Sequence, residues 1–379
     1  MIYLDHAATT RVHPEVVREM LPYFENWYGN PSSGYEFGRE SKAMIEQARK
    51  EIADSLRGKP EEIYFTSGGT EADNWVIFGI AESLKEKGRH IITSQIEHHA
   101  LLRSCEELEK RGYEVTYLPV DSYGVVDREA LARSIRPDTI LISIMYANNE
   151  IGTIQPVREI GMLARQHQVY FHTDGVQAYM HEPVDVQRDC IDLFSASGHK
   201  FQGPKGVGFL YARKGIGLPS WFYGGGQENR MRAGTENVPG IVGMAKAVSL
   251  GRRNMEEERR KLGQMQSFVM KEILRRIPEV RINGSASSRL KGNVHVSFKD
   301  VEGQSLLILM DMEEICLSSG SACSTGEEGI SHVLQGIGLP EEYARGSIRI
   351  TMGPENTMEE MAHFLRRLES MVRELRGQG

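Results

Sequence analysis

The chain contains few cysteines, and they lie far apart. Its 379 residues include four, namely Cys105, Cys190, Cys316 and Cys323. This number is too small, and the spacing too wide, for a disulfide framework or a paired-cysteine metal site. We therefore expect free thiols and no bound metal, although a metal site of Cys316, Cys323 and His332, without a recognised ligand spacing, stays open as an alternative.

Long apolar runs and clusters of basic residues are also missing. No uninterrupted apolar segment has membrane-spanning length, and the start of the chain lacks the basic and then apolar regions of a secretion signal. The 45 basic and 52 acidic residues give a net charge of −7, and the basic residues are scattered along the chain. The sequence therefore disfavours a membrane or a nucleic acid as a partner, and we expect a soluble, cytoplasmic protein.

What the chain has in abundance is short apolar strands that alternate with helical segments. Hydrophobic residues make up 40% of it, which is enough for two domains with a large core. The alternation predicts an α/β fold with a mainly parallel sheet covered by helices on both faces. The strands of this sheet are expected near residues 62–66, 90–94, 114–118, 139–145, 169–173 and 191–195.

A highly charged segment from Val238 to Arg276 predicts a long helix that bridges two domains. After it the chain alternates again, as in a smaller α+β domain, with strands expected at Asn293–Phe298 and Ser347–Thr351 and a helix at Met358–Leu375. We expect a large domain of residues 15–255 and a small domain of residues 1–14 and 256–379.

Two features are expected near the start of the chain. Pro14 opens a predicted helix that reaches about Trp27. Residues 5–10 are too small and too polar for a core, and they are predicted to form an arm or the edge of a site.

Polar side chains follow several of the predicted strands. Ligands of parallel α/β sheets bind at the carboxyl ends of the strands, and a glycine turn that leads into a helix suits a phosphate group. Each of these positions alone is also compatible with an ordinary turn or helix cap, but their recurrence at successive strand ends favours a ligand site. The positions are Gly69 and Thr70, His98, Asn149, and Asp174 with Gln177.

The last of these strand ends carries a lysine. The apolar run Ile191–Phe194 is followed by Ser197, His199 and Lys200 and then by glycines around Pro204. A lysine at such a place can lose its proton near neutral pH and attack carbonyl groups, while the serine and histidine can bind an anion. The pattern indicates a Schiff-base lysine; the alternative is a surface loop with solvated lysines.

Cys323 lies in a segment, residues 317–329, that consists almost entirely of small residues. Such a segment has little to pack in a core, so a loop is predicted. Because an accessible thiolate is a nucleophile, Cys323 is a candidate catalytic residue rather than filler.

Three motifs together resemble a known family. With Ser197-Gly198-His199-Lys200, Asp174–Gln177 and Ser319–Cys323 in view, the chain resembles the cysteine desulfurases that depend on pyridoxal phosphate, the nitrogenase-associated and iron–sulfur cluster group of the class V aminotransferase fold. The resemblance implies the fold type I architecture of pyridoxal-phosphate enzymes. It also implies conversion of L-cysteine to L-alanine, with the sulfur carried on Cys323 as a persulfide for iron–sulfur cluster assembly or tRNA thiolation.

The resemblance also implies roles for individual residues. Lys200 would bind the cofactor covalently and act in catalysis with Cys323 and His98, which would stack on the ring; Asp174 would pair with the pyridine nitrogen and Gln177 with the phenolic oxygen. The phosphate would be held by Gly69, Thr70, Ser197, His199 and, from the partner subunit of a homodimer, Thr235. The substrate carboxylate would be held by Asn149 and Arg349, and a sulfur-acceptor protein would be a further partner.

Other functions remain possible at this point. A selenocysteine lyase or a class V aminotransferase would share the lysine site, and a noncatalytic scaffold would share only the fold. Cys323, together with formation of alanine from cysteine without a keto acid, distinguishes a cysteine desulfurase from these two enzymes. The absorbance of a bound pyridoxal-phosphate cofactor would exclude the noncatalytic scaffold.

Overall fold

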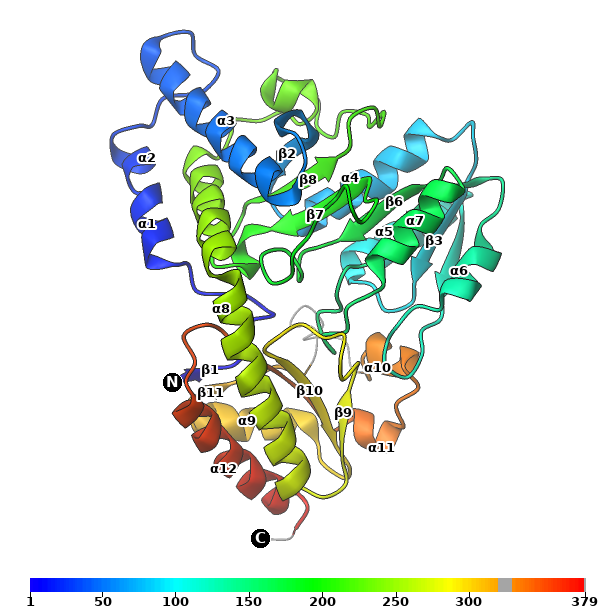
Figure 1. Ribbon diagram of the computed structural model, residues 1–379, viewed down its shortest axis with the longest axis vertical. Helices are drawn as coiled ribbons and strands as arrows, with labels where there is room; N and C mark the ends of the chain where they lie inside the picture. The colour runs from blue at the N-terminus through cyan, green and yellow to red at the C-terminus, as the bar shows by residue number, and fades with distance from the viewer. Residues whose placement is uncertain (320–328, 378–379) are drawn as a thin grey trace.

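Two parts of the chain are joined by one long helix, α8 (Val238–Arg276), which runs through both in Figure 1. The computed structural model describes residues 1–319 and 329–377. The Asn237 side chain caps α8 by accepting the Gly240 N–H, and Pro239 lies in its first turn, where no N–H is needed. The long helix predicted for this segment is confirmed.

The larger part is built on a sheet that, within the described residues, has the strand order β2-β8-β7-β6-β5-β3-β4. Strand β8 is antiparallel to both of its neighbours, and the other pairs are parallel. The predicted α/β fold with a mainly parallel sheet is therefore confirmed. The strands are β2 (Ile63–Thr66), β3 (His90–Ser94), β4 (Glu114–Leu118), β5 (Thr139–Ser143), β6 (Tyr170–Asp174), β7 (Leu193–Ser197) and β8 (Gly208–Ala212).

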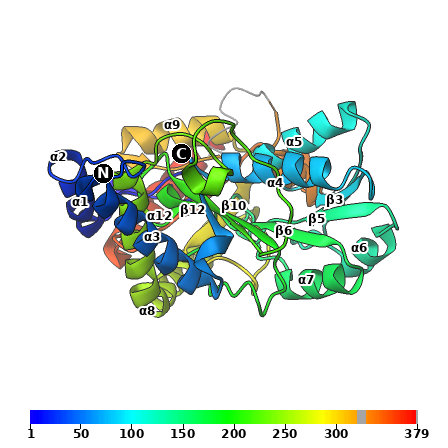
Figure 2. The same ribbon diagram turned by 90° about the horizontal axis from the view of Figure 1, so that it is seen from above.

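Helices cover both faces of this sheet. Figure 2 shows α4 and α5 on one face and α6 and α7 on the other. Side chains alternate along each strand, so that Ile91 packs in the core on the α4 side and Ile92 in the core on the opposite side. The helices of this part are α1 (Pro14–Met20), α2 (Pro22–Glu25), α3 (Glu36–Leu56), α4 (Gly69–Ser83), α5 (His99–Lys110), α6 (Arg128–Ser134) and α7 (Val157–Gln166), with short 3₁₀ turns η1 (Pro60–Glu62), η2 (Gly198–Lys200) and η3 (Gln227–Arg230).

Two predicted bounds are corrected by the structure. The helix expected from Pro14 to about Trp27 is interrupted after Met20, because Pro22 lacks the N–H that a continuous helix requires. Strand β7 begins at Leu193 rather than Ile191, because the carboxylate of Asp192 accepts the Phe171 N–H at 3.0 Å and pairs with Arg213 just before the strand.

The smaller part contains an antiparallel sheet in the order β12-β10-β9 and a parallel pair of β1 with β11. The strands predicted at Asn293–Phe298 and Ser347–Thr351 and the helix at Met358–Leu375 are present at those residues. The elements are β1 (Ile2–Tyr3), β9 (Val280–Asn283), β10 (Asn293–Phe298), α9 (Gly303–Met312), β11 (Ile315–Cys316), α10 (His332–Gly336), α11 (Glu341–Ala344), β12 (Ser347–Thr351) and α12 (Met358–Leu375).

Helix α8 changes its packing partners along its length. Its residues Ile241–Leu250 pack in the core beneath the large sheet, whereas Leu262–Ile273 pack in a second core with α12 and β10. Leu4, near the start of the chain, belongs to this second core. The change of partners supports our division into domains at residue 255, with residues 1–14 in the small domain, which remains a proposal.

The segment after Leu4 returns to the large sheet. The N–H of Thr10 donates to the carbonyl of His199 at 2.9 Å, so that residues 5–10 cross the carboxyl end of β7. We call residues 5–10 the N-terminal strap. No helix in the described ranges is long and apolar enough to cross a membrane.

Candidate active site

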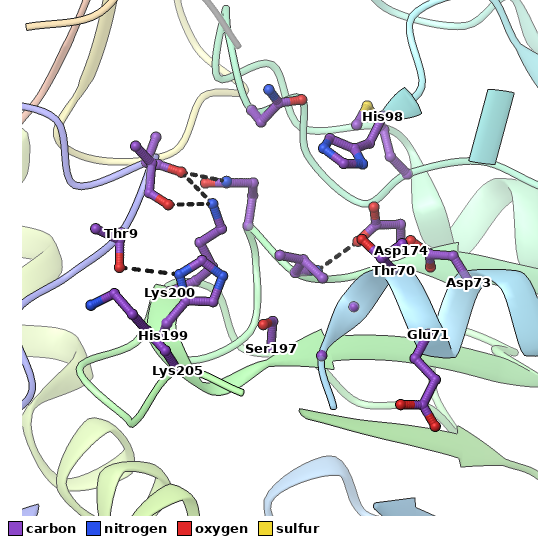
Figure 3. Close-up of a pocket in the computed structure, with 18 of the residues that line it drawn as sticks. Thr9, Thr70, Glu71, Asp73, His98, Asp174, Ser197, His199, Lys200 and Lys205 are labelled. Atoms are coloured by element: carbon purple, nitrogen blue, oxygen red, sulfur yellow. Dashed lines mark hydrogen bonds between the residues drawn. The ribbon is translucent and has the colours of Figure 1, made fainter. Parts of the chain in front are cut away.

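A cavity of about 480 Å³ lies at the carboxyl ends of the parallel strands, beside the N-terminal strap. Figure 3 shows side chains from several elements pointing into it, including those of Lys200 and His199 from η2, Asp174 from the end of β6 and Thr70 from the start of α4. The predicted site residues that line it are Gly69, Thr70, His98, Asn149, Asp174, Gln177, Ser197, His199, Lys200 and Arg349.

Lys200 follows β7 in the turn η2, and its amine meets the N-terminal strap. The Nζ atom donates hydrogen bonds to the carbonyls of Ala7 at 2.6 Å and Ala8 at 2.9 Å, as the dashed lines in Figure 3 show. The backbone carbonyl of Lys200 lies 3.0 Å from His181 Nε2. The strap therefore holds the side-chain amine of Lys200 at the cavity wall, and His181 holds its backbone carbonyl.

Asp174 ends β6 and lies on the floor of the cavity. Its Oδ1 accepts the Val176 N–H at 2.9 Å. The pKa of Asp174 is raised to about 6, because the effect of burial exceeds the lowering by the Val176 N–H and the nearby Lys200 amine. The next residue must be glycine, because a Cβ at Gly175 would lie 1.9 Å from the ring of Phe194.

The start of α4 forms one end of the cavity. The first N–H groups of a helix have no acceptor within the helix, and its dipole places positive potential there. A Cβ at Gly69 would lie 2.5 Å from Val176 Cγ2, so glycine lets the helix start approach the cavity floor closely. Thr70, Ser197 and His199 add side-chain donors, which makes this end fit for an anion.

His199 is held by the strap and is neutral. Its Nδ1 lies 3.1 Å from Thr9 Oγ1. Burial, and then the charges of Lys200 and Lys205, lower the pKa of His199 to about 4. His199 therefore offers a hydrogen bond rather than a charge, and Lys205, which also lines the cavity, supplies a cation.

His98 caps α5 and thereby has a fixed ring. Its Nδ1 accepts the Ala100 N–H at 3.1 Å. Burial, and then the charge of Lys200, lower the pKa of His98 to about 4, so the imidazole is neutral at pH 7. A neutral ring held in one orientation is suited to stacking on a flat ligand.

The opposite wall comes from the smaller part of the chain. Arg349 of β12 is 1% exposed, and its Nη1 donates to the carbonyl of Asn149 at 2.9 Å. Its Nη2 lies 2.8 Å from Asp5 Oδ1 in the strap, and its buried Nε has no hydrogen-bond partner within the described residues. The guanidinium is therefore positioned beside Asn149. Its ion pair with Asp5 was not predicted from the sequence.

Two predicted site residues do not line this cavity. Thr235 lies in a separate pocket with Arg232 and Glu236. Cys323 lies outside the residues that the structure describes.

Ala7, Ala8 and Thr9 line the cavity, in agreement with the prediction that residues 5–10 form an arm or the edge of a site. One residue of the site was not singled out from the sequence. Asp73 also lines the cavity; it lies three residues after Thr70 and so on the same face of α4, a spacing that could have identified it.

Comparisons with known proteins agree with this geometry. A family model described as Aminotransferase class-V matches residues 2–364. The chain is 52% identical to a cysteine desulfurase IscS of Methanosarcina thermophila, over 99% of this chain and 93% of that protein. It is 50% identical to a protein of the same name from Dictyoglomus turgidum, over 99% of this chain and 95% of that protein.

Solved structures are similar over nearly the whole chain. A NifS-like protein superposes with a TM-score of 0.93 at 37% identity, covering 98% of this chain and 99% of the other. SspA in complex with cysteine superposes with a TM-score of 0.84 at 37% identity, covering 94% of this chain and 100% of the other.

Proposed function

The chain belongs to the aminotransferase class-V family, and from this premise we propose that it converts L-cysteine to L-alanine and moves the sulfur onto Cys323 as a persulfide. It is a cysteine desulfurase that depends on pyridoxal phosphate. The observation that carries the proposal is that one cavity joins the Lys200 amine, the buried Asp174 carboxyl and the start of α4.

These groups fit pyridoxal phosphate. Its aldehyde requires an amine, which Lys200 offers; its phosphate requires an anion site, which the start of α4 offers with Thr70, Ser197 and His199. Its ring nitrogen requires an acidic partner. Within the described residues, the hydrogen bonds of the Asp174 carboxyl involve Oδ1 alone, so Oδ2 is left for such a partner. When bound, the cofactor supplies an electron sink for the charge that develops when a proton leaves the α-carbon of an amino acid.

Lys200 is proposed to move the proton. Its amine lies on the carbonyls of Ala7 and Ala8, from which it can turn toward a substrate bound in the same cavity. An amine at this place can take the α-proton and return it, because proton transfer requires a group within hydrogen-bond reach. Gln177, whose Nε2 donates to the Ala7 carbonyl at 3.0 Å, borders the same position and is proposed to bond the phenolic oxygen.

Arg349 and Asn149 are proposed to bind the substrate carboxylate. A guanidinium binds a carboxylate through two parallel hydrogen bonds, and the Nε of Arg349 has no partner in the described part of the chain. Asp5 holds the guanidinium at 2.8 Å and so fixes its orientation toward the cavity.

Cys323 is proposed to take the sulfur. Its thiolate would attack the substrate sulfur, so that a sulfur–sulfur bond forms while the carbon–sulfur bond breaks. The electron pair of the broken bond stays with the carbon, which takes up a proton as alanine forms. A protein that accepts sulfur from this persulfide is the further partner we propose, for iron–sulfur cluster assembly or tRNA thiolation.

Product analysis tests the proposed function. Purified protein supplied with pyridoxal phosphate and L-cysteine should form alanine without any added keto acid. Alanine that appears only after a keto acid is added would instead show an aminotransferase. A much faster reaction with L-selenocysteine than with L-cysteine would show a selenocysteine lyase.

We also propose that the protein is a cytoplasmic homodimer. Thr235 does not line the Lys200 cavity of its own chain but a pocket next to it, as expected if it serves the phosphate of a partner. Large apolar side chains are exposed on the single chain, among them Phe24 (61%), Tyr28 (71%) and Tyr223 (89%), which an interface would cover. Sedimentation at micromolar concentration should give the mass of two chains, and a fully active monomer would contradict the proposal.

A further inference from the structure

A second carboxyl group, that of Asp73, lies beside Asp174 beneath the cavity. Asp73 belongs to the start of α4, is 1% exposed and lines the same cavity as Asp174 and Lys200. Figure 3 shows the two labelled carboxyl groups as neighbours. Because Asp73 Oδ1 is buried without a hydrogen-bond partner in the described ranges, its protonation state needs an explanation.

The nearest candidate cation for Asp73 is a histidine that cannot serve as one. His172 Nε2 lies 3.6 Å from Asp73 Oδ1 and 3.0 Å from Ser195 Oγ, and His172 Nδ1 lies 2.7 Å from Ser143 Oγ. Burial lowers the pKa of His172 to about 3, so its ring is neutral. His172 therefore gives Asp73 no compensating positive charge.

The surroundings of the two carboxyl groups differ in one respect. The Lys200 amine lowers the pKa of Asp174 against the effect of burial. For Asp73, burial raises the pKa, and the charges of Asp174 and Glu97 raise it further, with only the Ser195 hydroxyl acting in the opposite direction. Two carboxylates in one buried site cannot both ionise cheaply, so the pair should share one negative charge unequally.

We propose that Asp73 is a positioning residue that acts on the cofactor through Asp174: as a neutral acid it leaves the single negative charge of the pair on Asp174, opposite the pyridine nitrogen. The inference rests on the proposed function, because it requires bound pyridoxal phosphate. Neutral Asp73 lets Asp174 keep its charge without a second buried anion beside it, and it fills the space that would otherwise admit water.

Infrared difference spectroscopy of the loaded protein tests the protonation state directly. The wild type at pH 7 should show protonated-carboxyl stretching bands, one from Glu97 and one that disappears in Asp73→Asn. The control is Glu82→Gln, the same chemical change at an exposed position of α4, which should leave both bands in place. Bands that are all unchanged in Asp73→Asn would overturn the proposal, because Asp73 would then be ionised.

Kinetics and cofactor absorbance supply a second test. Asp73→Asn, a neutral side chain of the same shape, should keep kcat within about threefold of the wild type, whereas Asp73→Ala should lower kcat about tenfold with little change in KM for cysteine. The pH titration of the cofactor absorbance should be shifted in Asp73→Ala and nearly unchanged in Asp73→Asn. An Asn variant as impaired as the Ala variant, with a shifted titration, would contradict the inference.

The two proposals fail in different ways. If the wild type makes no alanine from cysteine, the proposed function fails. If the wild type is active but Asp73→Asn removes no protonated-carboxyl band, only the inference about Asp73 fails.

Discussion

The two walls of the cavity bury charge in opposite ways. The wall proposed to hold the cofactor, which we call the cofactor wall, contains Asp73 and Asp174, with buried Glu97 close to them. The carboxyl groups of these acids meet backbone N–H groups, hydroxyls or a neutral ring. The wall proposed to bind the substrate, which we call the substrate wall, contains Asn149 and the buried cation Arg349, whose partner is the acid Asp5. The first wall lies within one sheet and the helix on it, whereas the second joins residues 344 positions apart. The cofactor site is thus local to one sheet, and the substrate site depends on how the two parts of the chain pack.

The largest loss of activity should follow from removing the amine of Lys200. Lys200→Ala should lower turnover about 1000-fold or more, because it removes the amine that is proposed to take the α-proton. Borohydride treatment of the loaded wild type should leave the cofactor covalently attached, and in the variant it should not. A variant that keeps the reducible link and full turnover would contradict the role given to Lys200.

Breaking the ion pair between Asp5 and Arg349 should lower the free energy of unfolding, which tests how the substrate wall is held together. Asp5→Ala leaves the buried guanidinium of Arg349 without its anion, which should lower the free energy of unfolding by about 3 kcal/mol. Urea unfolding measures this, and Glu82→Gln, which breaks an exposed ion pair, is the control with little expected change. Equal stability of the Asp5 variant and the control would mean that the pair does not hold the two parts together.

A smaller change to the same wall should affect substrate binding. Arg349→Lys keeps the charge but cannot bind a carboxylate through two parallel hydrogen bonds. We expect KM for cysteine to rise about tenfold with a smaller change in kcat, as for a group that binds substrate and transition state alike. The bound cofactor should keep its absorbance, because the cofactor wall is intact; a lost cofactor would show that the walls are not separable.

The most gradual effect should be a pH dependence of stability that comes from Glu97, close to the cofactor wall. The pKa of Glu97 is raised to about 8, because the effect of burial exceeds the lowering by the Ser94 hydroxyl and the Met145 N–H. Since the folded pKa exceeds the unfolded one, the folded state binds more protons, and this contribution to stability is lost as pH rises from about 5 to 8, by roughly 1 kcal/mol per unit. The urea midpoint of the wild type should therefore fall between pH 6 and 8 more than that of Glu97→Gln. Parallel curves would show that Glu97 is ionised throughout.

The sequence predicted the cofactor wall better than the substrate wall, for a physical reason. Asp174 and Lys200 follow apolar strands, and the carboxyl ends of parallel strands meet at one edge, so local patterns sufficed to place them together. The pairing of Asp5 with Arg349 depends on contacts between the two ends of the chain, which no local pattern contains. The break at Pro22 could have been predicted from its missing N–H, whereas the role proposed for Thr235 involves a partner chain.

Sulfur transfer to one residue is the central claim, and mass spectrometry after a single turnover tests it most directly. Wild-type protein loaded with pyridoxal phosphate and mixed with one equivalent of ³⁵S-cysteine should carry one labelled sulfur on the peptide that contains Cys323, with one alanine released. Cys323→Ser should still change the cofactor absorbance on binding cysteine but carry no label, because its hydroxyl stays protonated at neutral pH. Alanine and free sulfide formed by Cys323→Ser at the wild-type rate, without added thiol, would contradict the account.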